Sequence, residues 1–302
     1  MGRFGLIRAF GTAVMLFLAT AAVAGNEVSR QQGVPGGTAE VAGTTLSIGE
    51  LYRYQSLIGT TPEGYSWSSD SDTVLFLWND QGYSFRDIWT YSVRTGEKTR
   101  LTFLGQDSVP HAERPGISQA VMLGDSRVAF TLGGKLHIRE PDGSVSPIET
   151  EKQAVRGLAV SPDGKWLAFV SGSPVDTRNR VTLGGELWIR STEDRRENSA
   201  RRLVGSDDPK IYVQDYEWAD DSGSIVFHHS DDRAMPERDI YFYADGELQN
   251  NRVIRAFPGD ETTRARIGLV SLASNEIRYF DRPDPKHHIW DYGLSGDGKR
   301  LF

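Results

Sequence analysis

A short hairpin pattern that recurs along the chain limits its fold more than any other feature. The clearest copy runs from Ala159 to Val170 and holds a Ser-Pro-Asp-Gly turn between two apolar segments. Pro162 presets φ to about −65°, and Gly164 can take the positive φ that a chain reversal needs. The second segment, Trp166 to Val170, alternates its apolar residues with the period of a strand. The pattern therefore predicts a β-hairpin.

The hairpin pattern repeats four more times, so it describes an architecture rather than a local turn. Taking the closing Phe of each copy as a marker, the steps are 54 (76 to 130), 39 (130 to 169), 58 (169 to 227) and 75 (227 to 302) residues. Four-stranded propeller blades repeat with a period of roughly 40–50 residues. The last step leaves room for an insertion or for an unrecognised blade. The further copies are Trp67 to Phe76, Gly124 to Phe130 in shortened form, Trp218 to Phe227 and Leu294 to Phe302.

A second pattern follows the hairpins, an alternating aromatic and aliphatic segment that is in most copies closed by a Gly turn. Two hairpins per repeat give four antiparallel strands, which is one propeller blade. Nothing after the first hairpin shows the i, i+3, i+4, i+7 spacing of an amphipathic helix. We therefore predict an all-β chain, an incomplete β-propeller of about four to five blades over residues 46–302. The copies of the second pattern are Arg86 to Glu97, Gly134 to Gly143, Gly185 to Arg190 and Arg238 to Gly246.

The N-terminus has the three parts of a secretory signal peptide. Arg3 and Arg8 precede an apolar run, and Ala22-Val23-Ala24 forms a small-residue cleavage site before Gly25. The run is shorter than the ~20 apolar residues of a membrane-spanning helix. We expect residues 1–24 to be cleaved after Ala24, residues 25–45 to form a flexible leader, and the mature protein to be exported to the periplasm or outside the cell, with no membrane attachment.

Charge and composition exclude several kinds of partner and chemistry. The formal net charge of −7 becomes −9 once the two signal-peptide arginines are removed, because no acid leaves with them. Nucleic acids and anionic membranes attract basic surfaces, so neither is an expected partner. The chain has no cysteine, which excludes disulfides, thiolate metal sites and a cysteine nucleophile.

No motif in the chain predicts a metal site or a cofactor. His228 and His229 are adjacent on a predicted strand, so their side chains point to opposite faces. His287-His288, near Asp281 and Asp284, is interpreted as an exposed polar loop. Turn formation explains the acidic residues better than calcium binding, because the calcium-loop spacing and its terminal Glu are missing. These acidic residues are Asp70, Asp72, Asp80, Asp207, Asp208, Asp220, Asp221, Asp231 and Asp232.

Aromatic and charged residues within the repeats have mostly structural interpretations. Trp78 is predicted in a loop between strands, Trp290 falls outside the regular pattern, and Arg86 is expected to form a local ion pair with Asp87. The remaining tryptophans are expected to pack within the blades: Trp67, Trp89, Trp166, Trp188 and Trp218.

These motifs together resemble the N-terminal β-propeller of exported serine peptidases of the prolyl oligopeptidase family, and most of all the dipeptidyl peptidase IV N-terminal region. Similar WD40-like hairpins occur in periplasmic propellers that resemble TolB. The resemblance covers most of the mature chain. The residues that carry it are Leu46, Ser47, Leu51, Ser56 to Gly59, Pro62, Trp67 to Asp70, Phe76 to Trp78, Asp87 to Trp89, Leu101 and Thr102.

The resemblance implies a propeller that selects and gates peptide substrates for a C-terminal α/β-hydrolase domain. That domain's Gly-x-Ser-x-Gly motif is missing, so we expect no catalytic residue in this chain, no activity of the chain alone, and a chain truncated before the catalytic domain. The family's Glu-Glu pair, which holds the substrate's amino terminus, is also missing, and the nearest acidic cluster is Asp215-Tyr216-Glu217. Substrate-binding residues stay unassigned. Homo-oligomerisation is an expectation for the full-length protein.

Two other interpretations stay open. The first is a TolB-like propeller acting as a protein-binding module, although residues 25–45 leave no room for the α/β domain that precedes such propellers. The second is a propeller enzyme that works in its own channel, such as a glycoside hydrolase or lyase. That enzyme would need inward carboxylates at matched positions of several blades, and no such register is visible.

Overall fold

The structure is a computed structural model of the chain. It describes residues 59–105, 116–124, 126–150, 154–172, 185–194, 196, 199–281, 289, 291–295 and 300–302. The chain divides into two units, Met1–Tyr52 and Arg53–Phe302, and all described residues belong to the second. The predicted signal peptide with its Ala24–Gly25 cleavage site, the leader and the first residues of the predicted propeller lie outside the described residues. So do His287, His288 and Trp290.

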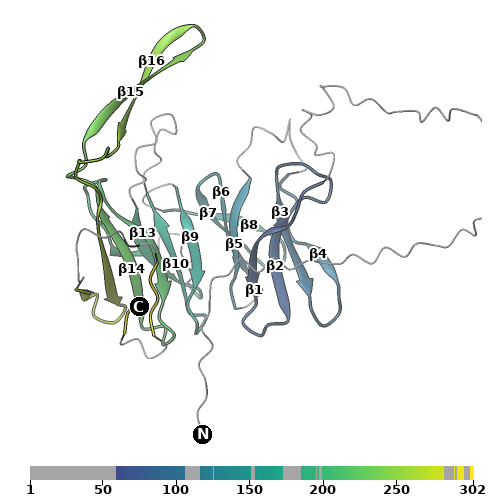
Figure 1. Ribbon diagram of the computed structural model, residues 1–302. Helices are drawn as coiled ribbons and strands as arrows, with labels where there is room; N and C mark the ends of the chain where they lie inside the picture. The colour runs from purple at the N-terminus through teal and green to yellow at the C-terminus, as the bar shows by residue number, and fades with distance from the viewer. Residues whose placement is uncertain are drawn as a thin grey trace, which may run out of the picture. The chain divides into compact units, whose positions relative to one another are not determined.

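The described residues form four antiparallel four-stranded sheets, here called blades 1 to 4, and contain no helix (Figure 1). In each blade the strands lie side by side in chain order, except for the insertion described below. Blade 1 contains β1 (Glu63–Trp67), β2 (Thr73–Trp78), β3 (Asp87–Ser92) and β4 (Lys98–Arg100); blade 2 contains β5 (Ile117–Met122), β6 (Val128–Leu132), β7 (Lys135–Arg139) and β8 (Val145–Ile148); blade 3 contains β9 (Arg156–Val160), β10 (Trp166–Ser171), β11 (Glu186–Ser191) and β12 (Arg201–Val204); and blade 4 contains β13 (Ile211–Trp218), β14 (Ser224–Asp231), β17 (Arg264–Ser271) and β18 (Ile277–Tyr279). The predicted all-β class is confirmed.

The recurring hairpin joins the first two strands of blades 1, 3 and 4 with one geometry, whereas the turn of blade 2 is one residue shorter and is closed by Leu123 N donating to Arg127 O (2.8 Å). In blade 3, Ser161 N donates to Trp166 O over 2.8 Å, and the Ser161 hydroxyl donates to Asp163 Oδ1 over 2.6 Å. Gly164 has φ 76°, as its place in the turn predicts. The same backbone bond recurs from Ser68 N to Thr73 O (2.9 Å), from Ala219 N to Ser224 O (3.0 Å) and from Ser295 N to Arg300 O (2.8 Å).

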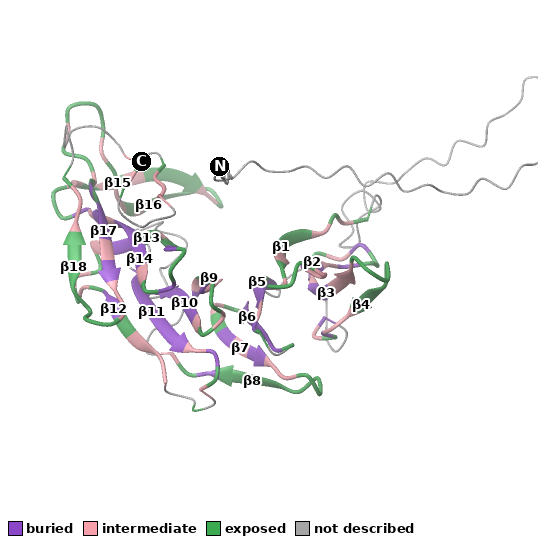
Figure 2. Ribbon diagram, turned by 90° about the horizontal axis from the view of Figure 1, so that it is seen from below, coloured by how far each residue is buried: buried purple, intermediate pink, exposed green. Residues whose placement is uncertain are grey.

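Three apolar cores lie at the three junctions between consecutive blades. The marker residues Phe130, Phe169 and Phe227, from β6, β10 and β14, are fully buried, and each belongs to the core that its blade shares with the preceding blade. Figure 2 shows the buried residues gathered on the central strands. Full burial of a Phe side chain contributes roughly 1.5–3 kcal/mol. Blade-to-blade packing therefore holds the described chain together.

The insertion lies in blade 4 and corrects one prediction. The segment Arg238 to Gly246 was expected to be the third strand of a blade. Instead β15 (Glu237–Ala244) pairs only with β16 (Glu247–Ile254), and the third strand of blade 4 is β17, which pairs with β14 from Ser224↔Ser271 to Asp231↔Arg264. We call the β15–β16 hairpin the arm. Figure 1 shows it extending beyond the end of blade 4. The long last step of the repeat thus contains an insertion.

A fifth copy of the hairpin follows blade 4. Within the described residues it consists of one bridge, Leu294↔Leu301. Four complete blades and the start of a fifth agree with the predicted count. In the described part of the chain, blade 4 does not pack against blade 1, so the ring of blades is open there. The described residues include no helix with the length and apolar character of a membrane span.

Candidate functional site

Side chains from a neighbouring blade bond to the backbone of the first strands of blades 3 and 4. Gln119 of β5 donates from Nε2 to Leu158 O (3.0 Å) and accepts from Leu158 N at Oε1 (2.8 Å). Its side-chain amide thus makes the pair of hydrogen bonds to β9 that a paired strand residue would make. Arg156 of β9 donates to Val213 O of β13 (3.0 Å). Burial lowers the pKa of Arg156. The first strands β5, β9 and β13 are therefore tied to one another by side-chain bonds to backbone groups.

Two aromatic residues of β13 make the reverse contact onto β9. The Tyr216 hydroxyl donates to Gly157 O, and Trp218 Nε1 donates to Ala159 O over 3.2 Å. Burial raises the pKa of Tyr216, so its hydroxyl stays a donor. A Cβ built on Gly157 would lie 3.5 Å from the Tyr216 ring, so the aromatic pair rests directly on the backbone of β9.

The acidic cluster singled out in the sequence lies on the opposite face of β13. Asp215 and Glu217 are exposed, and Asp215 accepts a 2.7 Å hydrogen bond from the Tyr292 hydroxyl. Burial, then this bond and the nearby carboxylates, raises the pKa of Tyr292. Two carboxylates at i and i+2 of a first strand could attract a cation such as a peptide's amino terminus.

Asp87 forms a buried polar network in blade 1, and it corrects a predicted ion pair. Its carboxylate is fully buried and accepts from Arg100 Nη2 (2.6 Å), the Thr102 hydroxyl (2.8 Å) and Leu104 N (2.9 Å). Arg86 instead lies 3.3 Å from Glu63 of β1. The prediction of a local Arg86–Asp87 pair is thus wrong, because Asp87 begins β3 with its carboxylate bonded to Arg100, whereas Arg86, just before the strand, pairs with Glu63.

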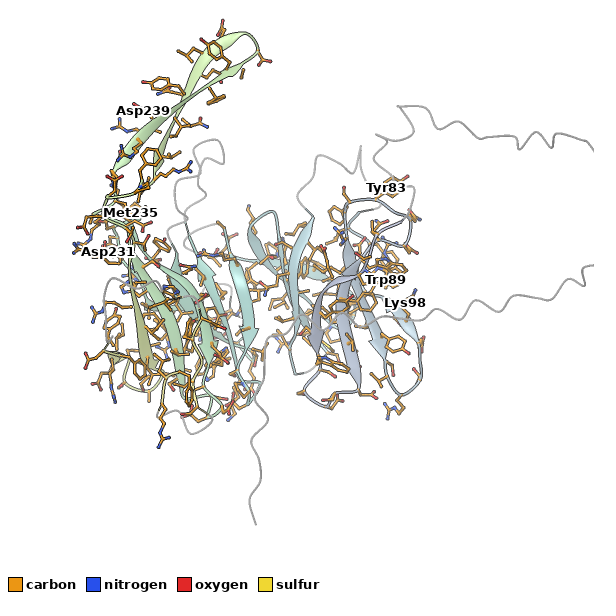
Figure 3. The ribbon with its side chains drawn as sticks, in the orientation of Figure 1. Tyr83, Trp89, Lys98, Asp231, Met235 and Asp239 are labelled. Carbon is orange, nitrogen blue, oxygen red and sulfur yellow. The ribbon has the colours of Figure 1, made fainter. Side chains whose placement is uncertain are left out.

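Aromatic rings and basic side chains meet on the face of blade 1 that points away from blade 2. Trp78 is the last residue of β2, not part of a loop, and its ring centroid lies 5.3 Å from that of Trp89. Lys98 Nζ lies 4.2 Å from the Trp78 centroid. Figure 3 shows Trp89 and Lys98 close together on this blade. Such cation–π contacts contribute about 0.5–1 kcal/mol when exposed.

The predicted packing role of the other tryptophans is confirmed except at one position. Trp89, Trp188 and Trp218 are buried, and Trp166 packs against the core between blades 3 and 4. Trp67 is 55% exposed although it is the last residue of β1. No neighbouring blade covers it among the described residues.

The arm is held firmly at its root and exposed along its length. Asp232, buried at the end of β14, accepts from the Thr263 hydroxyl (2.6 Å) and the Tyr212 hydroxyl (3.2 Å). Glu237 pairs with Lys210 (2.9 Å). Figure 3 marks the path from β14 into the arm through Asp231, Met235 and Asp239. Beyond the root, the large exposed side chains are Tyr241 (64%), Tyr243 (78%), Leu248 (58%) and Phe242 (37%).

The candidate metal-ligating residues do not come together. His228 is paired with Ile267 and His229 with Arg266, on opposite faces of β14, as the sequence predicts. No three His, Cys, Asp or Glu side chains of the described ranges could hold one metal ion. Asp70 accepts from the Ser68 hydroxyl (2.5 Å) and Asp72 N (3.1 Å), and Asp221 accepts from Gly223 N (2.8 Å), so these acids shape turns.

Two features were missed by the sequence analysis. The grip of Gln119 on β9 spans 39 residues and leaves no local pattern. The arm had a usable signal, because Asp245-Gly246 between the two eight-residue segments Glu237–Ala244 and Glu247–Ile254 is a hairpin turn of the Asp-Gly type. Taken together, these two segments and their turn predict a separate hairpin rather than one strand of a blade.

Four consecutive four-stranded antiparallel blades, stacked face to face around tied first strands, define a β-propeller, which is incomplete in the described residues. The fold has known counterparts. Dipeptidyl peptidase 4 of Porphyromonas gingivalis superposes with a TM-score of 0.55 and 14% identity over 79% of this chain and 35% of that chain.

Two other solved structures are similar at lower scores. Hydrazine synthase of Kuenenia stuttgartiensis matches with a TM-score of 0.48 and 11% identity, over 83% of this chain and 76% of that one. TolB of Acinetobacter baumannii matches with a TM-score of 0.43 and 12% identity, over 80% of this chain and 48% of that one. The chain thus spans about a third of the dipeptidyl peptidase 4 chain and about half of the TolB chain. No family model and no curated protein matches the sequence.

Proposed function

We propose that this chain is the non-catalytic propeller portion of an exported serine peptidase, in which it selects and gates peptide substrates for an α/β-hydrolase domain outside this sequence. The observation that carries the proposal is the likeness of fold to dipeptidyl peptidase 4, joined to the sequence motifs that resemble the same class of propeller. Nucleic acid, metal and cofactor have no part in this proposal.

The propeller's contribution is selection rather than bond breaking. A ring of blades placed over a hydrolase leaves only narrow entrances, so long or folded chains are kept from the nucleophile. The exposed carboxylates Asp215 and Glu217 give β13, the first strand of blade 4, a negative field, which favours positively charged peptide ends. Export follows from the signal peptide, with cleavage between Ala24 and Gly25.

The test uses the native protein and a serine-hydrolase probe. Antibodies raised against this 33.5 kDa chain are used to isolate the native protein from its source. We expect a larger polypeptide that is labelled by a fluorophosphonate, while the 302-residue chain stays unlabelled. Its N-terminal sequence should begin at Gly25. A native polypeptide of about the chain's own mass, without label, contradicts the proposal.

A second candidate function, a TolB-like protein-binding module, is favoured by one observation, the projecting arm with its exposed aromatic residues. Large exposed apolar surfaces mark interaction sites. If this second function is correct, the same experiment should recover an unlabelled native protein together with a bound partner. The partner should no longer be recovered when Tyr241 and Tyr243 are changed to Ser.

A further inference from the structure

The first strand of blade 1, β1, carries an aromatic pair that repeats the pair on blade 4. Tyr65-Ser66-Trp67 of β1 and Tyr216-Glu217-Trp218 of β13 both end their strand at the recurring turn. The registers agree, because Trp67 pairs with Val74 and Trp218 with Ile225, each seven residues on. Both strands also carry a register shift in this region, between Glu63 and Ser66 in β1 and between Val213 and Asp215 in β13. The two pairs therefore occupy equivalent positions in their blades.

This position faces the preceding blade wherever a preceding blade is described. Ala120 of β5 belongs to the core that blade 2 shares with blade 1, and Leu158 of β9 to the core that blade 3 shares with blade 2. Both are buried, at 2% and 4% exposure. On blade 4, Tyr216 and Trp218 rest on β9, as described above. The position is thus a docking position for the first strand of the blade before it.

Among the four described blades, only blade 1 leaves this position uncovered. Tyr65 is 60% exposed and Trp67 55%, whereas Trp218 is 9% exposed. The Tyr65 hydroxyl donates to Pro62 O in its own segment (2.9 Å), and no hydrogen bond of the Trp67 indole to another described residue is present. Burying both rings would remove apolar area that contributes roughly 25 cal/mol per Å².

We infer that Tyr65 and Trp67 form a docking pair for the first strand of a further blade of the same ring. The contact between blades 3 and 4 indicates the chemistry of that strand. It should offer two backbone carbonyls at alternate positions, as Gly157 and Ala159 do, with small side chains beneath the rings. A branched residue at either position would hold the aromatic rings off the backbone. The inference needs only the propeller fold and is independent of the peptidase assignment.

Oxidative footprinting tests whether the pair is covered. The indole of Trp67 is oxidised with hydroxyl radicals in the 302-residue chain and in the native protein isolated from its source, and the modified peptides are quantified by mass spectrometry. The ratio of 55% to 9% exposure predicts oxidation about sixfold slower in the native protein. Tyr243, on the arm and 78% exposed, is the internal control and should react equally in both. Equal oxidation of Trp67 in the two samples overturns the inference.

Photo-crosslinking identifies what covers the pair. A benzoylphenylalanine replaces Tyr65, whose exposed ring makes the substitution tolerable, in the protein expressed from its own gene in its source. A crosslink within the same polypeptide, to a strand with Gly, Ala or Ser at alternate positions, is the expected result. A crosslink to a second copy, to a different protein or to a glycan overturns the inference, and so does a crosslink yield at Tyr65 no higher than that of the same probe at Val93, a solvent-exposed turn residue.

Discussion

At the scale of single residues, a charged side chain affects the stability of this protein most where it is buried. The carboxylate of Asp87 is fully buried and is compensated by one guanidinium, one hydroxyl and one backbone amide. A buried charge that loses its partner keeps its desolvation cost, whereas an exposed ion pair is largely screened. Two arginines of blade 1 allow the two situations to be compared in one sheet.

We expect Arg100→Ala to destabilise the protein by about 3 kcal/mol or more, because it leaves Asp87 buried without its cation. Arg94→Ala is the matched control. Arg94 also pairs with an aspartate, Asp72 at 3.1 Å, but its side chain is 79% exposed, and the expected loss is below about 1 kcal/mol. Urea unfolding of the three proteins measures both values. Equal losses would contradict the assigned role of burial.

The recurring turn places a serine in the left-handed region at three positions, Ser71, Ser126 and Ser222. Ser71 has φ 59° and is exposed, and Ser222 has φ 58° and accepts from Asp163 N of the neighbouring blade (2.9 Å). The left-handed conformation costs a non-glycine residue roughly 1–2 kcal/mol. Ser71→Gly should therefore stabilise the protein by about 0.5 kcal/mol, after the glycine's extra unfolded-state entropy is subtracted. Ser222→Gly should destabilise it, since the link between blades is lost. Thermal unfolding of both variants decides this, and a gain in both would refute the role of the Ser222 hydroxyl.

At the scale of strands and hairpins, local sequence patterns predict the hairpins but do not predict the contacts between residues far apart in the sequence. The turn chemistry around Gly164 and the alternation after it predict β9 and β10 from a dozen residues. The fourth blade was misassigned because its third strand, β17, is separated from β14 by the arm, and adjacency in sequence favoured β15. The exposure of Trp67 could not be read from the sequence either, since a strand position shows which face a residue occupies but not whether another sheet covers that face.

Deleting the arm should leave the blades intact. Replacing Glu237–Ile254 by a two-residue Asn-Gly turn removes the two strands that pair only with each other, together with their aromatic side chains. We expect a cooperative unfolding transition with a midpoint within a few degrees of the parent's and an unchanged far-UV circular dichroism per blade residue. Loss of cooperativity would mean that the arm supports blade 4.

At the scale of the whole molecule, stability is the sum of the junctions between blades, and two histidines make it depend on pH. Burial lowers the pKa of His229, with Arg266 acting in the same direction and Asp231 opposing it. Burial also lowers the pKa of His137, whose ring stacks on Phe130 at 5.2 Å. Both rings therefore favour the neutral form when the protein is folded.

This asymmetry predicts acid destabilisation in the mildly acidic range. An unfolded histidine has a pKa of about 6.5, above that of either folded histidine, so protonation favours the unfolded chain. The stabilising contribution is complete above that pH and is lost as the pH falls through the folded pKa values. Melting temperatures measured from pH 7.5 to 5 should fall, and the fall should be smaller in His229→Gln and His137→Gln. Parallel curves for parent and variants would contradict the assignment.

The arm also has a consequence for the rate at which blade 4 assembles. Strands β14 and β17 are separated by 32 residues, 232 to 263, which must be looped before they pair. The arm pairs 18 of these residues, 237 to 254, in a hairpin of their own, so only 14 residues remain in the loop that must close before β14 and β17 pair. Because closure entropy grows as about (3/2)RT ln n, the shorter effective loop saves roughly 0.7 kcal/mol. A hairpin that forms in microseconds can thus bring two distant strands together before the slower pairing begins.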